Sequence, residues 1–171
     1  MSESIGAAYL QTATRWFNYY KSLAEKTFDQ LNDGDFHYVP AEESNSIAVI
    51  LQHMTGNMFS RWTNFLSEDG EKEWRARDEE FEIHEYSKQQ LIEIWNNGWN
   101  CFFEALHSLS ELDLMKTVYI RKEPLLVIDA INRQLAHYPH HVGQILYIGK
   151  SIKGKNWKNL SIAKRKTGNT S

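Results

Sequence analysis

Cysteine, proline and glycine are all scarce in this sequence of 171 residues. A single cysteine, Cys101, excludes an internal disulfide framework and suits a reducing compartment. Three prolines and nine glycines are few for an all-β protein, whose frequent turns require both residues. The scarcity of turn residues therefore favours a helical protein.

Long apolar runs and a strong net charge are missing as well. No segment approaches the roughly 18 apolar residues that a membrane-spanning helix requires. The N-terminal stretch has no basic region followed by an uninterrupted apolar one, so no secretory signal is expected. The net charge of −3 provides no general attraction to nucleic acid or to acidic membranes. We expect a cytoplasmic protein that binds neither.

Aromatic residues are plentiful, at 13% of the chain, and the length suits one domain with a substantial core over residues 1–171. Four segments show the three- and four-residue spacing of apolar side chains that is typical of helices. These segments cover residues 5–31, 44–66, 87–110 and 126–152. Each apolar stripe needs a partner, so the pattern predicts an all-α protein, a four-helix bundle around a shared core.

Capping residues support two of these helix starts. Ser44 or Ser46 can cap the second helix, and Ser87 with Gln90 has the pattern of a capping box at the start of the third. Before the fourth helix, apolar residues 118–120 and 125–127 flank the polar stretch 121–124, which predicts a small hairpin.

Two segments stand out by their charge. Residues 68–82 form a strongly acidic connection, whereas the tail from about residue 154 to 171 contains basic residues and no acid. We interpret the basic tail as a solvated chain end, although such a tail could also contact phosphates.

Two histidines of the fourth predicted helix, His137 and His141, are four residues apart and therefore share a face. Ile145 and Ile148 lie on that face too, so both imidazoles should point toward the core. A buried neutral imidazole must satisfy a donor and an acceptor, and a divalent cation bound by both rings would help to do so. The pair predicts either a metal site or a hydrogen-bonded pair of histidines. The glutamate of the helical zinc-protease motif is absent, which excludes a protease of that type.

His53, in the second predicted helix, is the candidate third ligand. It lies at the border of the apolar stripe, where a side chain can reach a neighbouring helix, or simply form an interfacial hydrogen bond. Pro139 removes a backbone donor between the paired histidines, so we expect a kink or bulge there. His140 is an alternative ligand, but we favour His141 because it shares a face with His137.

The remaining histidines have no partner at ligand spacing, and we assign surface or capping roles to His37, His84 and His107. Cys101 lies on the apolar side of the third predicted helix, which indicates packing rather than a nucleophile.

The arrangement of histidines resembles a known superfamily. A histidine in the second helix and an H-x-x-x-H motif followed by Gly-Gln in the fourth are similar to the DinB/YfiT-like superfamily, which is regarded as a group of metalloenzymes. Here these residues are His53, His137, His141, Gly143 and Gln144. Residues 52–66, parts of 69–82 and residues 157–162 resemble one branch of unknown function within it.

The resemblance implies an up-down-down-up four-helix bundle with one metal ion on the three histidines, and usually a homodimer. For the dimer we expect aromatic helix faces to meet, chiefly on the first helix. An all-imidazole shell favours zinc or nickel. Some members of the superfamily are thiol-dependent transferases, whereas this branch has no assigned reaction.

Three neutral histidines would leave a coordination position open, as in catalytic rather than structural zinc sites. We therefore expect a metal-dependent enzyme that activates a low-molecular-weight thiol or a water, as a transferase or a hydrolase. Its catalytic residues are unassigned, because no carboxylate has an obvious spacing to the histidines. By proximity alone, Asn57, Tyr138 and Gln144 are candidates to orient ligands. The alternatives are a non-catalytic module in which the ion stabilises the fold or senses a small ligand, and a stress-related interaction protein.

Overall fold

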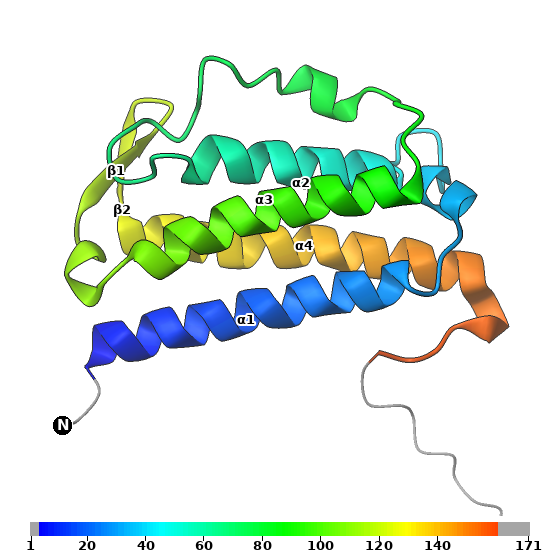
Figure 1. The fold of residues 1–171 in the computed structure, drawn as a ribbon, viewed down its shortest axis with the longest axis horizontal. Helices are drawn as coiled ribbons and strands as arrows, with labels where there is room; N and C mark the ends of the chain where they lie inside the picture. The colour runs from blue at the N-terminus through cyan, green and yellow to red at the C-terminus, as the bar shows by residue number, and fades with distance from the viewer. Residues whose placement is uncertain (1–3, 161–171) are drawn as a thin grey trace, which may run out of the picture.

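The computed structural model describes residues 4–160. Within this part of the chain four long helices lie alongside one another (Figure 1), and a small two-stranded sheet precedes the last. The helices are α1 (Ile5–Phe28), α2 (Ile47–Trp62), α3 (Lys88–Ser108) and α4 (Val127–Lys153). The strands are β1 (Thr117–Ile120) and β2 (Glu123–Leu126). The mostly helical fold and the hairpin are thus confirmed.

The directions of the helices can be followed in the colours of Figure 1: α1 and α4 run one way, and α2 and α3 run the other. α2 packs mainly on α3, and α1 packs mainly on α4. Because α2 and α3 are parallel neighbours, the chain must return along their length between them. Residues 63–87 do so over the outer side of α2, and we call them the crossover segment. The segment includes the short 3-10 helix η2 (Asp78–Phe81), which contacts α2.

Caps and backbone geometry explain where the helices begin and end. The hydroxyl of Ser46, rather than that of Ser44, accepts the Val49 amide at 3.3 Å, so α2 begins later than predicted. α2 ends at Trp62 because the chain turns away and Asn64 adopts a positive φ of 50°. α1 also ends three residues before its predicted end.

The predicted capping box of α3 is present. The Ser87 amide donates to the Gln90 side-chain oxygen at 2.9 Å, and the Gln90 amide donates to the Ser87 hydroxyl at 3.3 Å. The box satisfies two amides that a helix start would otherwise leave unpaired.

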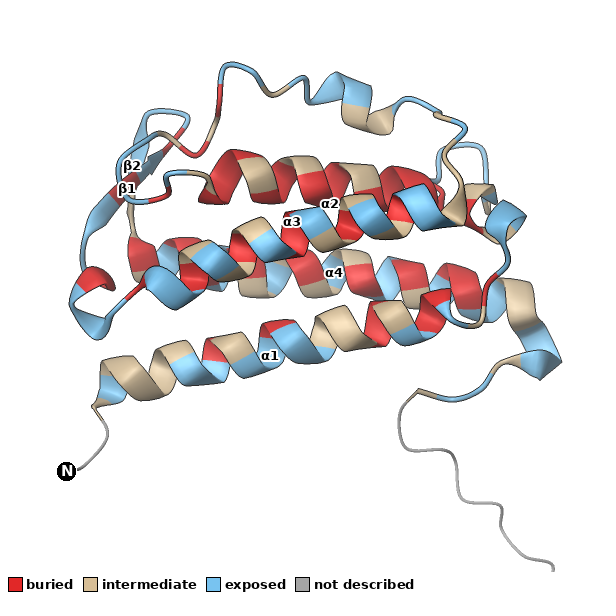
Figure 2. Ribbon diagram, viewed as in Figure 1, coloured by how far each residue is buried: buried red, intermediate tan, exposed pale blue. Residues whose placement is uncertain are grey.

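The core lies between the four helices, and Figure 2 shows buried residues on their facing sides. Aromatic rings dominate its middle: Phe17 and Phe102 are 4.5 Å apart at their centroids, and Tyr138 lies 5.5 Å from Phe102. α2 is buried on almost all sides, because α3 covers one face and the crossover segment covers another.

The hairpin pairs Thr117 with Leu126 in an antiparallel register, so the second strand begins and ends earlier than predicted, and Val127 belongs to α4. Its turn residues Arg121 and Lys122 both have a positive φ, as tight hairpin turns of this hand require. Asp69 of the crossover segment accepts both of their amides, at 2.9 and 2.7 Å. The hairpin is thereby attached to the crossover segment.

None of the helices in residues 4–160 combines the length and the apolar character needed to cross a membrane. Two lysines of the basic tail, Lys155 and Lys158, are among the described residues. The backbone of Lys158 is hydrogen-bonded to the side chain of Gln30, just after the end of α1. The remaining basic residues of the tail, Lys164, Arg165 and Lys166, lie outside the described residues.

Candidate metal centre

The fold brings the three histidines singled out from the sequence to one place. His53 comes from α2, and His137 and His141 come from α4. One potential ligand atom from each residue lies within 4.8 Å of the other two, an arrangement that could hold a metal ion. His53 is buried and the other two are partly buried, so the group sits at the edge of the core.

His137 and His141 are each held from behind by a glutamine. The Oε1 atom of Gln134 lies 3.2 Å from Nδ1 of His137, and the Oε1 atom of Gln144 lies 2.9 Å from Nδ1 of His141. An amide oxygen can only accept a hydrogen bond, so each Nδ1 carries the hydrogen. In the neutral rings, Nε2 is then the nitrogen with a free lone pair.

The two Nε2 atoms face each other at 3.1 Å. Two lone pairs at this distance repel unless a cation lies at them. Burial, with the charges of His141 and His53 nearby, lowers the pKa of His137 to about 3, and burial also lowers the pKa of His141. A proton therefore does not occupy this position near neutral pH, whereas a divalent ion suits it. Nitrogens that share one zinc ion at 2.0–2.1 Å lie on the order of 3.3 Å apart.

His53 is held by a carboxylate of the crossover segment. Its Nδ1 lies 3.0 Å from Oε2 of Glu80. The Glu80 carboxylate also accepts two hydrogen bonds from Arg75, at 2.7 Å on Oε1 and 2.9 Å on Oε2. Burial alone would raise the pKa of Glu80, but the bonds from His53 and Arg75 outweigh burial and lower it. The ionised carboxylate can only accept, so the hydrogen of His53 is on Nδ1 and its Nε2 is free for an ion.

Glu80 is a site residue that the sequence did not reveal, because it lies in the segment interpreted only as an acidic connection. One signal pointed to it. Gly56 is an interior glycine of α2, three residues after His53, and a Cβ there would lie 2.6 Å from Cδ of Glu80. Glycine at this position leaves room for the carboxylate against the helix.

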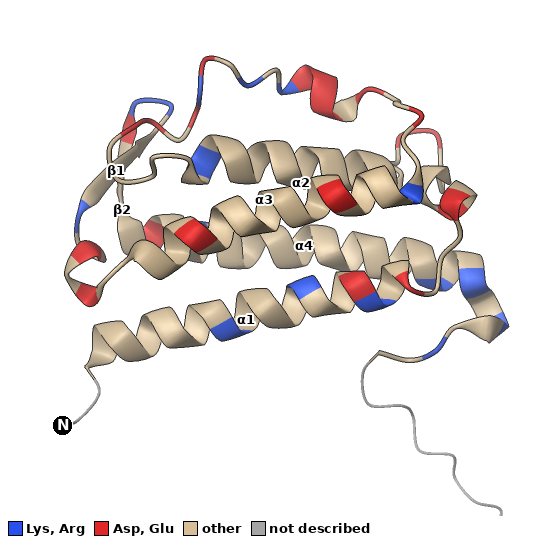
Figure 3. Ribbon diagram, viewed as in Figure 1, with Lys and Arg blue, Asp and Glu red and all other residues tan. Residues whose placement is uncertain are grey.

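The crossover segment carries interleaved acidic and basic residues, whereas the helices carry few charges (Figure 3). Part of its acidic character is compensated within the molecule. Arg75 has only 3% of its side chain exposed and lies 3.8 Å from Glu71, which in turn pairs at 3.0 Å with Arg61 of α2. Part of the connection is therefore a packed structure and not a free acidic surface.

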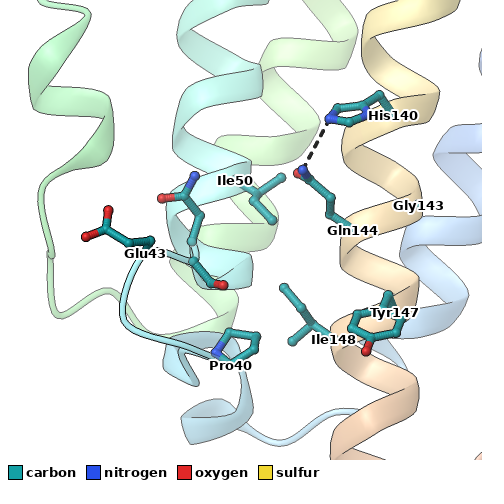
Figure 4. Close-up of a pocket in the computed structure, with 10 residues that line it drawn as sticks. Pro40, Glu43, Ile50, His140, Gly143, Gln144, Tyr147 and Ile148 are labelled. Carbon is teal, nitrogen blue, oxygen red and sulfur yellow. Dashed lines mark hydrogen bonds between the residues drawn. The ribbon is translucent and has the colours of Figure 1, made fainter.

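A cleft of about 460 Å³ is lined by His140 and Gln144 but by none of the three grouped histidines (Figure 4). It lies between α4 and the start of α2 with its preceding loop, with Ile50 on the α2 side and Gln144 on the α4 side (Figure 4). Its lining residues are Pro40, Glu43, Ser44, Asn45, Ile50, His140, Gly143, Gln144, Tyr147 and Ile148. Gln144 belongs both to the cleft and to the support of His141.

His140 lines this cleft and does not join the three-histidine group. It is exposed, and its Nε2 lies 3.2 Å from Nε2 of Gln144. The Gln144 amide thus bridges two histidines, accepting from His141 and donating to His140. α4 continues through Pro139 without a break in the helix.

Of the three residues suggested to orient ligands, Gln144 contacts a histidine of the group. The Tyr138 hydroxyl instead accepts from Trp62 Nε1 at 3.1 Å and donates to Asn57 at 3.3 Å, inside the core. Gln134 has the supporting role that the sequence analysis did not assign.

The other histidines lie away from the group. His37 contacts the Tyr86 carbonyl at 2.8 Å, His84 lies against the Tyr86 ring, and His107 stacks on Phe103. Cys101 is half-buried, burial raises the pKa of its thiol, and it packs against the core. These positions agree with surface and packing roles.

Fold and site together define a mostly helical protein with a three-histidine group able to hold a metal ion. A comparison with protein families identifies the family of the chain. The model of the family DUF1572, described as a protein of unknown function, matches residues 4–166. The chain therefore belongs to this family. No curated protein matches the sequence.

Proposed function

We propose that this protein is a metal-dependent enzyme with one divalent ion on His53, His137 and His141. One observation carries the proposal: the three rings have their Nδ1 atoms engaged by Glu80, Gln134 and Gln144, which leaves three Nε2 lone pairs for one cation. Supporting residues of this kind fix the tautomer and the orientation of metal-binding histidines.

The three histidine ligands determine how much positive charge a bound ion would keep. Three neutral imidazoles add no negative charge, and the nearby carboxylate of Glu80 is already paired with Arg75. When bound, a divalent ion would supply Lewis acidity, which favours the ionised form of a thiol or water that binds to it. The histidines and their supports would hold the reacting group in place beside the cleft.

A low-molecular-weight thiol suits this site better than water. Among residues 4–160, the carboxylate that contacts the histidines is that of Glu80, and its bonds to Arg75 and His53 leave it poorly placed to accept a proton. A thiol needs less help to ionise than water does. The reaction class proposed is transfer of a thiol to an electrophile, with hydrolysis as the second candidate.

We further propose that the fold is a DinB/YfiT-like bundle that uses zinc or nickel, because its helix directions and histidine positions agree with that resemblance. A homodimer through α1 is part of the same proposal. Trp16 and Tyr19 support it, since 44% and 46% of their surfaces are exposed on α1. Light scattering at micromolar concentration tests the dimer, which a Trp16→Lys change should weaken.

The decisive experiment begins with protein purified without a metal-affinity tag. Elemental analysis should find about one divalent ion per chain, and cobalt substitution should then allow titration with small thiols. A sulfur-to-cobalt charge-transfer band and turnover of an electrophile, both lost in His53→Ala, would support the enzyme. If thiols leave the cobalt spectrum unchanged and no electrophile or ester is turned over, a non-catalytic ligand-binding role replaces it.

A further inference from the structure

The crossover segment contacts His53 from two directions. The Glu80 carboxylate bonds to Nδ1 of His53 at 3.0 Å, and the Phe81 ring lies 4.9 Å from the imidazole at the centroids. Both residues belong to η2, the part of the crossover segment that packs on α2. One short helix of a long connection thus fixes the position of one histidine of the group.

The contact is anchored in the rest of the fold. Arg75 binds the Glu80 carboxylate through two nitrogens and has 3% of its side chain exposed. Gly56 gives the carboxylate room, since any Cβ there would overlap it. The Arg77 guanidinium lies over the Phe81 ring, 5.2 Å from its centroid. These contacts hold η2 in a defined position against α2.

We propose that Glu80 is a positioning residue for the metal centre and that the crossover segment acts as a clasp over His53. Closure of this clasp and binding of the metal favour each other. The inference rests on the proposed metal site. A cation on Nε2 withdraws electron density from the ring, so Nδ1–H of His53 becomes a stronger donor to Glu80. Coupling of this kind is reciprocal: the factor by which the clasp tightens metal binding is the factor by which metal stabilises the clasp.

The first test compares two adjacent glutamates. Glu80→Gln removes the charge bonded to His53 and Arg75, whereas Glu79→Gln makes the same chemical change at an exposed neighbour. Loss of a residue that supports a metal-binding histidine weakens metal affinity by about 10–100-fold. We expect such a loss for Glu80→Gln in calorimetric titration with zinc, and unchanged affinity for Glu79→Gln. Circular dichroism should show that both variants keep the helix content of the wild-type protein.

A second variant changes the residue of α2 that lies against Glu80. Gly56→Ala should displace the Glu80 carboxylate and weaken zinc binding in the same direction, although alanine favours the helix itself. Gly143→Ala is the matched control, because a Cβ at Gly143 meets nothing within 4 Å. A purely structural role for Glu80 would lower thermal stability without changing zinc affinity.

Hydrogen exchange supplies the reciprocal readout. The amides of Glu80 and Glu82 donate to the carbonyls of Arg77 and Glu79 at 3.2 Å, so they report on opening of η2. Saturating zinc should slow their exchange in the wild-type protein, and it should slow it less in Glu80→Gln. Equal zinc affinity of Glu80→Gln and wild type would overturn this inference and leave the proposed function intact. A wild-type protein that binds no divalent ion would overturn both.

Discussion

The Nε2 atoms of His137 and His141 point at each other at 3.1 Å, while their Nδ1 atoms are engaged by glutamines. A hydrogen-bonded pair of neutral histidines would need one ring to turn its hydrogen inward, and the amide oxygens behind both rings oppose that. The pair could therefore hold a shared cation.

Loss of a ligand should abolish stoichiometric metal binding. His141→Ala removes one of the two facing nitrogens, so the ion content should fall from about one per chain to a trace in elemental analysis. His84→Ala serves as the control, since His84 lies against Tyr86 away from the group. Tight binding that survives removal of both His137 and His141 would refute the assignment.

The metal-free protein should lose stability as the solution becomes acidic. The folded-state pKa of His137 is lowered from 6.5 to about 3, so between these values the unfolded chain binds a proton that the folded chain does not. The free energy of unfolding should therefore fall as pH decreases from about 6.5 toward 3. Above about 6.5 neither state binds this proton, so the stability associated with neutral His137 should be fully present.

The measurement is urea unfolding in the presence of a chelator, at several pH values in this window. His137→Gln should flatten the pH dependence relative to the wild type, while His107→Gln, at an exposed position, should leave it unchanged. Parallel pH profiles for wild type and His137→Gln would show that His137 titrates normally in the folded protein.

Tyr138 should stabilise the core through its hydroxyl. Tyr138→Phe leaves the Trp62 indole N–H and the Asn57 side chain without this buried partner. An unsatisfied buried donor costs about 1–3 kcal/mol, so the free energy of unfolding should drop by about that amount. Tyr147→Phe, where 71% of the residue is exposed, should change stability little. Equal effects of the two changes in urea unfolding would contradict this account.

The cleft that Gln144 lines offers a test of where substrates enter. Gly143→Leu places a side chain where a Cβ meets no atom within 4 Å, so folding and metal content should be retained. Thiol perturbation of the cobalt spectrum and any turnover should weaken if substrates enter through this cleft. Ala136→Leu places the same side chain at another exposed position of α4 and should have no such effect. Unaltered thiol binding by Gly143→Leu would place the entry elsewhere.

Local patterns explain most of what the sequence predicted. The apolar stripes, the Ser87 capping box and the four-residue spacing of His137 and His141 all arise from contacts within one helix. The support of each paired histidine is local too: Gln134 and Gln144 each lie three residues from the ring they contact. Gln134 was nevertheless missed, because a glutamine that follows Asn132 and Arg133 looks like an ordinary polar residue of a helix.

Contacts between distant segments were harder to predict. His53 was assigned to the group only at the border of a stripe and through a family resemblance, since spacing says nothing about which helices become neighbours. Glu80 is 27 residues from His53 and lies in a segment without helical periodicity. The interior glycine Gly56 was the one local sign that a group from elsewhere approaches α2 at this point.

The placement of the three histidines on α2 and α4 has a consequence for the unfolded chain. An ion held by His53 and His137 would tie together two points roughly 80 residues apart, much as a disulfide does. While it stayed bound to the unfolded chain, the ion would close a loop of that size and remove denatured-state entropy equivalent to on the order of 4 kcal/mol. In a chain whose one cysteine cannot form an internal disulfide, such an ion would be a reversible cross-link, made and broken by metal supply.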